Sequence, residues 1–413
     1  MNIGIVTTWF ERGAAYVSRA YMNVLSKDND VFIYARGGEA QARGNPTWDI
    51  PNVTWSPVLH GFFIDSTEAI SRFHFLRWLR NNRIDIVFFN EQAYIQIVKE
   101  VSELGYKTGS YIDYYTEDTV PDFDIFDFLI CNTKRHYSVF KEHRRCLYIP
   151  WGTNIDVFYP NAARPLSNDD IVFFHSAGLA HAASIRKGTD LLIQSFLRVT
   201  GNARLVIHSQ VALNQYGDDV MNMVSSDPRI EFIKKSVSAP GLFFLGDVYV
   251  YPTRLEGIGL TIAEALASGL PVITTDDMPM NEFVRDQYNG LLVKVSNRHR
   301  RSDGYYWPLS IVDIPDLTEK MQAYVDDRQL VAVHSVNART SAEQLFNWEK
   351  NTKDLSGWFS KIPTGNVCHR IGFNRFLRWC LFDAFLFAQG YISRAVKACI
   401  TSEKTRKVLK RIL

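Results

Sequence analysis

The stretch YPTRLEGIGLTIAEALASGLPVI, residues 251–273, decides the fold of this chain. An apolar strand ends at Pro252, a Gly-x-Gly turn follows at Gly257 and Gly259, and a helix is predicted over Leu260–Ser268. The strand-like run PVITT follows this helix. Strand, glycine turn, helix and strand in this order are typical of a parallel α/β sheet, where the turn leaves free N–H groups at the helix N-terminus.

Two acidic residues, Glu256 and Glu264, surround this turn. At helical spacing eight residues span about 800°, roughly 80° beyond two full turns, so both carboxylates are expected to face one cleft. The helix N-terminus attracts an anion, and carboxylates accept hydrogen bonds from hydroxyl groups. The segment therefore predicts a site for a ligand that carries both phosphate and sugar hydroxyls.

Length and composition describe an ordinary globular protein. The chain has 413 residues, 46% hydrophobic and 22% charged, which is enough for two domains and an extension. The first residues, MNIGIVTTWF, indicate a first strand rather than a signal peptide, and no apolar run is long enough to predict a membrane span. Five scattered cysteines without a C-x-x-C motif favour a reducing, cytoplasmic location and predict neither a zinc site nor a disulfide framework.

Charge is distributed unevenly. Residues 366–413 carry ten Lys or Arg against two acids, whereas residues 1–365 carry 36 against 42. An acidic body with a basic tail argues against nucleic acid as a partner. It suits a protein that binds peripherally to the anionic cytoplasmic face of a membrane. Apolar residues from Phe373 to Ala388 recur at i, i+3, i+4 spacing and predict an amphipathic helix, which either packs on the first domain or lies on a membrane.

Strand-like and helix-like segments alternate twice along the chain, which predicts two α/β domains with parallel sheets and a ligand cleft between them. The predicted domains are residues 1–160, residues 161–345 and a helical extension over 346–413. Predicted strands are Asn2–Thr7, Val31–Ala35, Asp85–Phe89, Lys107–Ile112, Phe128–Cys131, Ile171–His175, Leu205–Ser209, Ile230–Ile233, Val248–Tyr251 and Val272–Thr275. Predicted helices are Ala14–Ser26, Thr67–Asn81, Tyr94–Leu104, Thr189–Val199, Ala212–Val224 and Leu260–Ser268.

Five segments in the same order resemble the retaining GT-B glycosyltransferases, specifically glycosyltransferase family 4 (glycosyl transferases group 1). They are IPWGTNIDVFYP (149–160), SIRKGTDLLIQSF (184–196), LGDVYVYPTRLEGIGLTIAEALASGLPVI (245–273), NEFVRDQYNGLLV (281–293) and FNWEK (346–350). The resemblance implies two facing Rossmann-like domains, a nucleotide diphosphate sugar bound mainly by the second domain, and transfer with retention to a glycan or lipid-linked acceptor at the first. It implies no cofactor and no metal.

The resemblance also implies roles for individual residues of the second domain. Glu264 would bind the donor ribose, and Glu256 would lie close to the donor sugar. The backbone at Gly257, Ile258, Gly259 and Leu260 would approach the sugar and diphosphate. Lys187 and Arg186 would hold the diphosphate and stabilise the departing nucleotide; here the family's usual Gly-Arg pair is replaced by Gly178-Leu179 and a longer loop.

In the first domain, Gly13 matches a family glycine loop at the donor–acceptor junction, although only one of the usual two glycines is present. Asp113 falls where many members have a His-Asp pair, with Ile112 in the place of the histidine. Asp113 is therefore a candidate for catalysis or acceptor binding, or else a structural acid at a strand end. The Asp122-Phe-Asp124 run looks like a D-x-D metal motif but fits a turn before a buried strand better.

The sequence thus predicts a cytoplasmic, metal-independent, retaining glycosyltransferase of polysaccharide or glycolipid biosynthesis. Two alternatives stay open at this stage: a non-catalytic subunit that binds a nucleotide sugar, and another GT-B enzyme such as a nucleotide-sugar epimerase.

Overall fold

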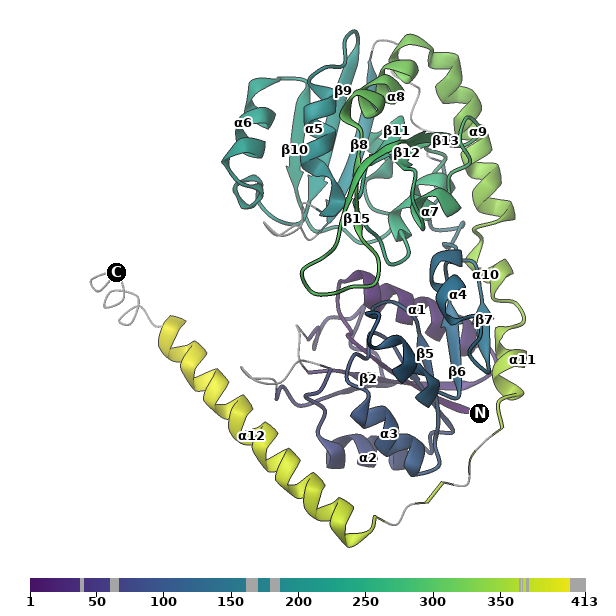
Figure 1. The fold of residues 1–413 in the computed structure, drawn as a ribbon, viewed down its shortest axis with the longest axis vertical. Coiled ribbons are helices and arrows are strands. Elements are labelled where there is room, and N and C mark those ends of the chain that lie inside the picture. The colour runs from purple at the N-terminus through teal and green to yellow at the C-terminus, as the bar shows by residue number, and fades with distance from the viewer. Residues whose placement is uncertain are drawn as a thin grey trace.

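The computed structural model describes residues 1–37, 41–59, 67–160, 170–178, 186–363, 365, 367–368 and 371–401. Two α/β domains lie one above the other along the long axis of the molecule (Figure 1). The first contains a seven-stranded parallel sheet in the order β3-β2-β1-β4-β5-β6-β7. Its strands are β1 (Asn2–Thr7), β2 (Asp30–Ala35), β3 (Val53–Trp55), β4 (Ile86–Phe89), β5 (Lys107–Tyr111), β6 (Phe128–Cys131) and β7 (Cys146–Tyr148).

The second domain contains a six-stranded parallel sheet in the order β10-β9-β8-β11-β12-β13. Its strands are β8 (Ile171–Gly178), β9 (Ala203–Ser209), β10 (Ile230–Lys234), β11 (Val248–Tyr251), β12 (Val272–Thr275) and β13 (Gly290–Val293). Strand order reverses between β1 and β4 in one sheet and between β8 and β11 in the other, as in doubly wound folds that bind ligands at the carboxyl ends of their strands.

Helices cover both sheets. The first domain has α1 (Gly13–Leu25), α2 (Arg72–Asn81), α3 (Gln96–Glu103), η1 (Val120–Ile125) and α4 (Lys134–Phe140). The second has α5 (Thr189–Phe196), η3 (Leu213–Tyr216), α6 (Asp218–Ser226), η4 (Phe243–Leu245), α7 (Leu260–Ala267), η5 (Met280–Glu282), α8 (Ile314–Asp326) and α9 (Arg328–Gln344). The predicted α/β class, with two Rossmann-like domains and a C-terminal helical region, is confirmed.

Several predicted boundaries were wrong for local reasons. The helix predicted over Thr67–Asn81 begins at Arg72, because the Ser71 hydroxyl caps it by accepting a hydrogen bond from the His74 N–H at 3.2 Å. The helix predicted over Ala212–Val224 is split by Gly217, whose φ of +90° no helix accommodates. The antiparallel hairpin of β14 (Val295–His299) and β15 (Leu309–Val312) was not predicted.

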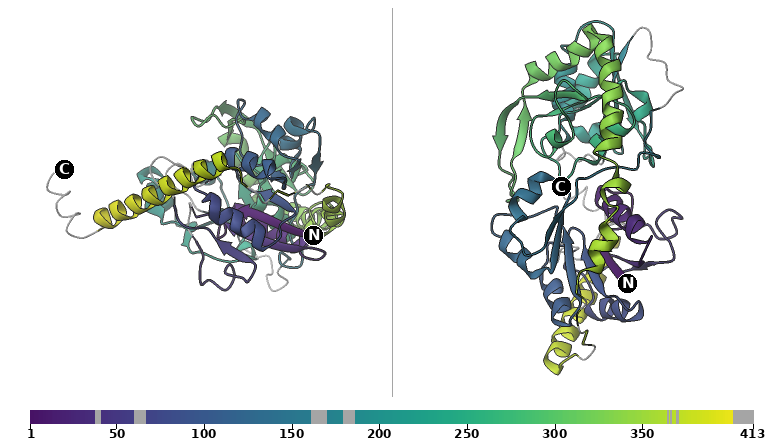
Figure 2. Two further views of the ribbon diagram at one scale, coloured as in Figure 1. Left: turned by 90° about the horizontal axis from the view of Figure 1, so that it is seen from below. Right: turned by 90° about the vertical axis from the view of Figure 1, so that its right-hand side faces the viewer.

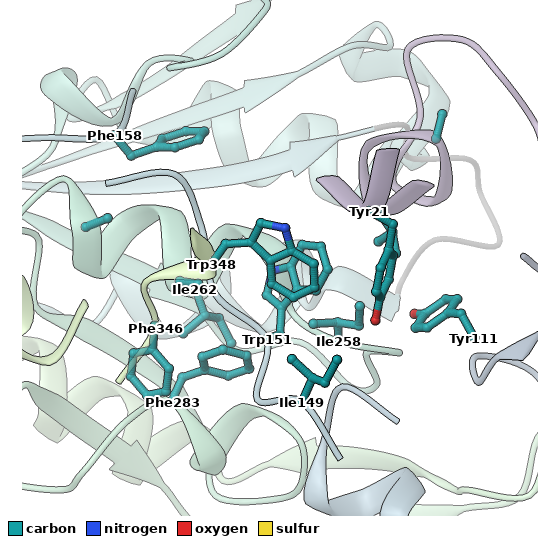
Figure 3. Close-up of a cluster of buried hydrophobic side chains, with 14 of the residues drawn as sticks. Tyr21, Tyr111, Ile149, Trp151, Phe158, Ile258, Ile262, Phe283, Phe346 and Trp348 are labelled. Carbon is teal, nitrogen blue, oxygen red and sulfur yellow. The ribbon is translucent and has the colours of Figure 1, made fainter. Parts of the chain in front are cut away.

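After the second domain the chain returns to the first through α10 (Trp348–Asn351) and α11 (Leu355–Ser360). At this crossing Asn347 forms a parallel bridge with Thr153 of the outgoing connection. The Trp348 ring lies 4.5 Å from that of Trp151, and its Nε1–H donates to the Ala20 carbonyl of α1 at 3.1 Å (Figure 3). The predicted domain boundary at residue 161 borders residues 161–169, which lie outside the described part.

The last helix, α12 (Phe373–Thr401), runs along the first domain and extends away from it (Figure 1). Asp383 of α12 is buried and caps α2, because its carboxylate accepts from the Ser71 hydroxyl at 2.7 Å and from the Arg72 N–H at 2.8 Å. The predicted helix therefore does pack on the first domain. The basic run over residues 404–411 lies outside the described residues.

Candidate active-site cleft

A cleft of about 2170 Å³ separates the two domains, and both domains line it. All ten predicted site residues lie on its walls: Gly13, Asp113, Arg186, Lys187, Glu256, Gly257, Ile258, Gly259, Leu260 and Glu264. They come from the loops that follow β5, β8 and β11 and from the starts of α1 and α7. The carboxyl ends of parallel strands thus bring together residues that are up to about 250 positions apart in sequence.

The glycine turn between β11 and α7 is shaped by its two glycines. Gly259 immediately precedes α7. Its φ of +94° is a backbone conformation that residues other than glycine rarely adopt. A Cβ atom on Gly257 would lie 2.3 Å from Oδ1 of Asp113 in the first domain. Glu256 precedes this turn and is not helical, so a helical rotation does not relate it to Glu264, but both acids line the cleft as predicted.

Glu256 is buried at the centre of a network of charged and polar groups. Its Oε1 accepts from Lys187 Nζ at 2.7 Å, from the Tyr251 hydroxyl at 2.8 Å and from the Thr253 hydroxyl at 2.9 Å. Arg186 Nη1 lies 4.0 Å from Oε2. Burial alone would raise the pKa of Glu256, but the charges of Lys187 and Arg186 outweigh it and lower this pKa to about 2. The carboxylate is therefore ionised at neutral pH.

Lys187 and Arg186 owe their positions to Gly188, which precedes α5. Gly188 has a φ of +71°, and a Cβ there would lie 2.0 Å from the Pro252 carbonyl oxygen. The segment therefore packs directly against the end of β11. Burial lowers the pKa of Lys187, whereas Glu256 raises the pKa of Arg186. The longer loop that precedes this pair, residues 179–185, lies outside the described residues.

Glu264 lies one turn into α7, with its carboxyl group in the cleft. Burial raises its pKa to about 7. Within the described part of the chain no group donates a hydrogen bond to this carboxylate. The Glu264 side chain is half-buried. A carboxylate that is partly removed from water without a donor is unfavourable, so a ligand that offers hydroxyl groups would be bound favourably there.

Asp113 follows β5 and meets a second acid, Glu91, which the sequence did not single out. Burial and the charge of Glu91, with which it shares a hydrogen bond, raise the pKa of Asp113 well above its usual range. Glu91 has a φ of +51° and lies 3.3 Å from the Arg12 guanidinium. A raised pKa keeps a carboxyl group protonated to higher pH, and in that form Asp113 can donate as well as accept hydrogen bonds at the first-domain wall.

The β14–β15 hairpin crosses the cleft from the second domain to the loop after β5. Its Tyr305 forms an antiparallel bridge with Thr116 and donates its hydroxyl to the Asp113 carbonyl at 3.1 Å. The Tyr305 ring stacks on Tyr114, with centroids 5.2 Å apart. The hairpin therefore contributes to the wall beside Asp113, and its tip lies at the opposite edge of the cleft from the α9–α10 crossing (Figure 2).

Among the residues that the structure describes, no three His, Cys, Asp or Glu side chains are placed to hold a metal ion. Asp122 and Asp124 lie in η1, the turn that precedes the buried strand β6, as the sequence predicted. The predicted independence of metal ions stays a prediction. In the described part of the chain no helix combines the length and apolar character of a membrane span.

The arrangement of two facing Rossmann-like domains around this cleft defines the GT-B fold. Solved structures agree: a glycosyltransferase from Rickettsia africae superposes with a TM-score of 0.69 at 13% identity over 87% of this chain and 98% of that one. Anabaena Alr3699/HepE, in complex with UDP and glucose, superposes with a TM-score of 0.67 at 14% identity over 87% and 99%.

Sequence comparison adds the family. Residues 172–301 match the family model of the glycosyl transferases group 1. The lipopolysaccharide core biosynthesis mannosyltransferase LpsB of Rhizobium meliloti is 26% identical over 136 residues, which is 32% of this chain and 34% of that protein. The chain spans about a quarter to three fifths of the length of the curated relatives that it matches. The chain thus has the fold of the GT-B glycosyltransferases, and residues 172–301 of its second domain match the group 1 glycosyl transferases in sequence.

Proposed function

We propose that the protein is a retaining glycosyltransferase that moves a sugar from a nucleotide diphosphate sugar to an acceptor hydroxyl in polysaccharide or lipopolysaccharide biosynthesis. The observation that carries this proposal is the pairing of Lys187 with Glu256 at 2.7 Å, beside the glycine turn and in the same cleft as Glu264. These groups offer positive charge, backbone N–H groups and hydroxyl acceptors, which a nucleotide diphosphate sugar requires.

The donor would lie against the second domain. Lys187 and Arg186 would contact the diphosphate and stabilise the negative charge that it gains as the bond to the sugar breaks. The N–H groups at Ile258, Gly259 and Leu260 would add to this stabilisation at the N-terminus of α7. Glu264 would accept hydrogen bonds from the ribose, and Glu256, held by its neighbours, would accept from a hydroxyl of the donor sugar.

The acceptor would enter from the first domain. Asp113 and Glu91 line the cleft opposite the glycine turn, and the contact between Asp113 and Gly257 closes the cleft at this point. The carboxyl oxygens of Asp113 and Glu91 can orient an acceptor hydroxyl by accepting its hydrogen bond. Gly13 at the start of α1 lies 3.7 Å, measured from an ideal Cβ, from the Leu260 side chain and leaves room where donor and acceptor would meet.

The experiment that tests this function begins with a thermal-shift screen of nucleoside diphosphates and their sugars. A ligand that binds only the native state raises the melting temperature. UDP-sugars come first, because Alr3699/HepE binds UDP and glucose in the same fold. Slow release of nucleotide from the stabilising donor without an acceptor, accelerated by glycan acceptors, would support the transferase.

The alternatives give different results in the same experiment. A non-catalytic subunit would be stabilised by a nucleotide sugar and would release no nucleotide from it. An epimerase would change the sugar configuration without any acceptor. If no nucleoside diphosphate or sugar nucleotide raised the melting temperature, the proposed site would be wrong.

We also propose an anionic membrane surface as a partner, with α12 as the contact. The side of α12 that faces away from the first domain is apolar: Phe373 is 77% exposed, Leu381 65% and Ile392 57%. Arg378 and Arg394 are also exposed. Asp383 is the one acid in the sequence of α12, and it is buried against α2. An apolar face with positive flanks suits the interface of an anionic bilayer.

A further inference from the structure

Three consecutive hydrogen bonds connect the β14–β15 hairpin, through two side chains of the first domain, to the glycine turn before α7. Trp307 Nε1 lies 2.7 Å from the Tyr115 hydroxyl oxygen. That oxygen lies 3.0 Å from His136 Nδ1, and His136 Nε2 lies 3.0 Å from the Gly257 carbonyl oxygen. Trp307 and Gly257 belong to the second domain, whereas Tyr115 and His136 belong to the first. The three bonds therefore exist together only when the cleft is closed.

The chemistry of the groups fixes every proton in these three hydrogen bonds. The indole of Trp307 can only donate and the carbonyl of Gly257 can only accept. Tyr115 therefore accepts from Trp307 and uses its one proton to donate to His136 Nδ1, which leaves the imidazole proton on Nε2, directed at Gly257. This assignment requires a neutral imidazole. Burial and the neighbouring charge of Arg135 lower the pKa of His136 to about 3, so it is neutral at pH 7.

We call the three hydrogen bonds through Trp307, Tyr115 and His136 to the Gly257 carbonyl the relay. Tyr115 and His136 are both buried, and other contacts hold the relay in place. Tyr306 donates its backbone N–H to the Tyr115 carbonyl at 3.0 Å, which aligns the hairpin tip with the loop after β5. The Arg135 guanidinium lies 4.5 Å from the centre of the Trp307 ring. Glu282 of the second domain accepts from the Arg135 N–H at 2.9 Å and so fixes the first turn of α4, which carries His136.

The last bond of the relay has a direct consequence for the glycine turn. A peptide unit is planar and trans, so its C=O and N–H point in opposite directions. When His136 holds the Gly257 carbonyl, it also fixes the direction of the Ile258 N–H. This N–H belongs to the turn in which glycine leaves the backbone most freedom, because Gly257 and Gly259 flank it.

We propose that Trp307, Tyr115 and His136 are positioning residues that hold the Gly257–Ile258 peptide in the orientation required for catalysis, so that the hairpin assembles the donor site on closure. This proposal rests on the proposed sugar transfer for its catalytic meaning. The relay should affect turnover more than ground-state binding of the donor, since the orientation of the Ile258 N–H matters most when negative charge develops on the departing diphosphate.

The test compares full-length Trp307→Phe with full-length Tyr306→Phe. Trp307→Phe removes the indole N–H and keeps an aromatic ring. Tyr306 is its neighbour at the hairpin tip, and its hydroxyl makes no hydrogen bond to any described residue, so Tyr306→Phe is the matched control. The first readout is hydrogen–deuterium exchange of the backbone over residues 255–262, which does not depend on activity. The second is kcat and donor KM.

We expect Trp307→Phe to accelerate exchange over residues 255–262 and to lower kcat about fivefold to tenfold, on the scale of one lost hydrogen bond, with donor KM within about twofold. Tyr306→Phe should match the wild type in both readouts. Tyr115→Phe, which removes the central hydroxyl, should reproduce Trp307→Phe and serves as the second variant if Trp307→Phe does not fold.

Unchanged exchange over residues 255–262 in the folded variant would overturn the relay, whatever the activity. Equal loss of activity in Trp307→Phe and Tyr306→Phe would also overturn it, since the hairpin would then act through packing alone. Faster exchange in a protein whose wild type neither binds nor turns over a nucleotide sugar would support the relay as a structural coupling and refute the proposed function. The two failures are therefore distinguishable.

Discussion

Lys187 Nζ and Glu256 Oε1 lie 2.7 Å apart in the interdomain cleft, and the charge of each opposes the effect of burial on the pKa of the other. The charges of Lys187 and Arg186 keep Glu256 ionised in spite of its burial, whereas Glu256 only partly offsets the lowering of the Lys187 pKa by burial. The pair lies 69 residues apart in sequence, on the segments that follow β8 and β11. Because these strands are neighbours in the sheet, the pair can form only in the folded second domain.

Lys187→Ala should lower kcat/KM by roughly 10²–10³, the scale expected when one preorganised charge is removed from a transition state. It should also raise the pKa of Glu256, because the largest opposing charge is lost. Steady-state kinetics across a range of pH measures both effects. The control is Lys294→Ala, because the Lys294 side chain is 81% exposed. A Lys187 variant that keeps most of its activity would remove Lys187 from the donor site.

Glu264→Gln should have opposite effects on stability and on donor binding. The folded pKa of about 7 exceeds the unfolded value, so the stability that protonation provides is complete below the unfolded pKa and falls as the pH rises towards 7. At pH 8 the neutral variant should therefore have a higher melting temperature than the wild type, and its free energy of unfolding should be higher by at most about 3 kcal/mol. At pH 4 the two proteins should have the same melting temperature.

The same Glu264→Gln variant should bind the donor more weakly, because an amide nitrogen cannot accept a ribose hydrogen bond. Donor KM should rise more than kcat falls. Thermal melts of the ligand-free protein measure the effect on stability, and donor titrations measure the effect on donor affinity. Equal melting temperatures at pH 8 would contradict the raised pKa, and a fall in kcat with donor affinity intact would contradict the ribose role.

Activity should persist in excess EDTA. Lys187, Arg186 and the N-terminus of α7 would supply the stabilisation of the diphosphate that a divalent ion supplies in other enzymes. Turnover before and after chelation, with and without added Mn²⁺ or Mg²⁺, measures this directly. Loss of turnover that Mn²⁺ or Mg²⁺ restores would refute the prediction and make Asp122 and Asp124 candidate ligands.

Deletion of residues 392–413 should weaken binding to anionic liposomes and spare the fold. It removes seven of the ten basic residues beyond residue 366 but leaves Asp383 on the N-terminus of α2. Each basic residue near an anionic surface contributes about 1 kcal/mol, less as salt increases. Flotation at about 0.1 M salt, with circular dichroism and turnover of a soluble acceptor as controls, measures the effect. A full-length protein that ignores the liposomes would show α12 to be structural.

The sequence predicted the elements that are buried on both faces. β1, β6, β11 and β12 have the bounds that the sequence predicted, because these parallel strands are buried at nearly every position and are therefore mostly apolar. Three strands at sheet edges, β3, β7 and β13, were missed. β3 and β7 have only three residues each, too few to show a period.

The site could be predicted in its parts but not in its contacts. Glu256, Lys187 and Glu264 are recognisable because they lie in segments with a fixed order of glycine, charge and helix. Glu91 and His136 carry no such local signal. The partner of His136, the Gly257 carbonyl, is 121 residues away in the other domain, so this contact depends on how the domains face each other.

The bridge between Thr153 and Asn347 places both connections between the domains at one edge of the cleft. Gly152 keeps them close, because a Cβ there would lie 2.5 Å from the Phe346 carbonyl oxygen. Two adjacent connections act as a single hinge. When the domains rotate about a hinge at one edge of the cleft, the displacement of an atom grows with its distance from the hinge. The hairpin tip lies at the opposite edge (Figure 2), so a rotation about this hinge would displace Trp307 from Tyr115 farther than it displaces residues beside the hinge.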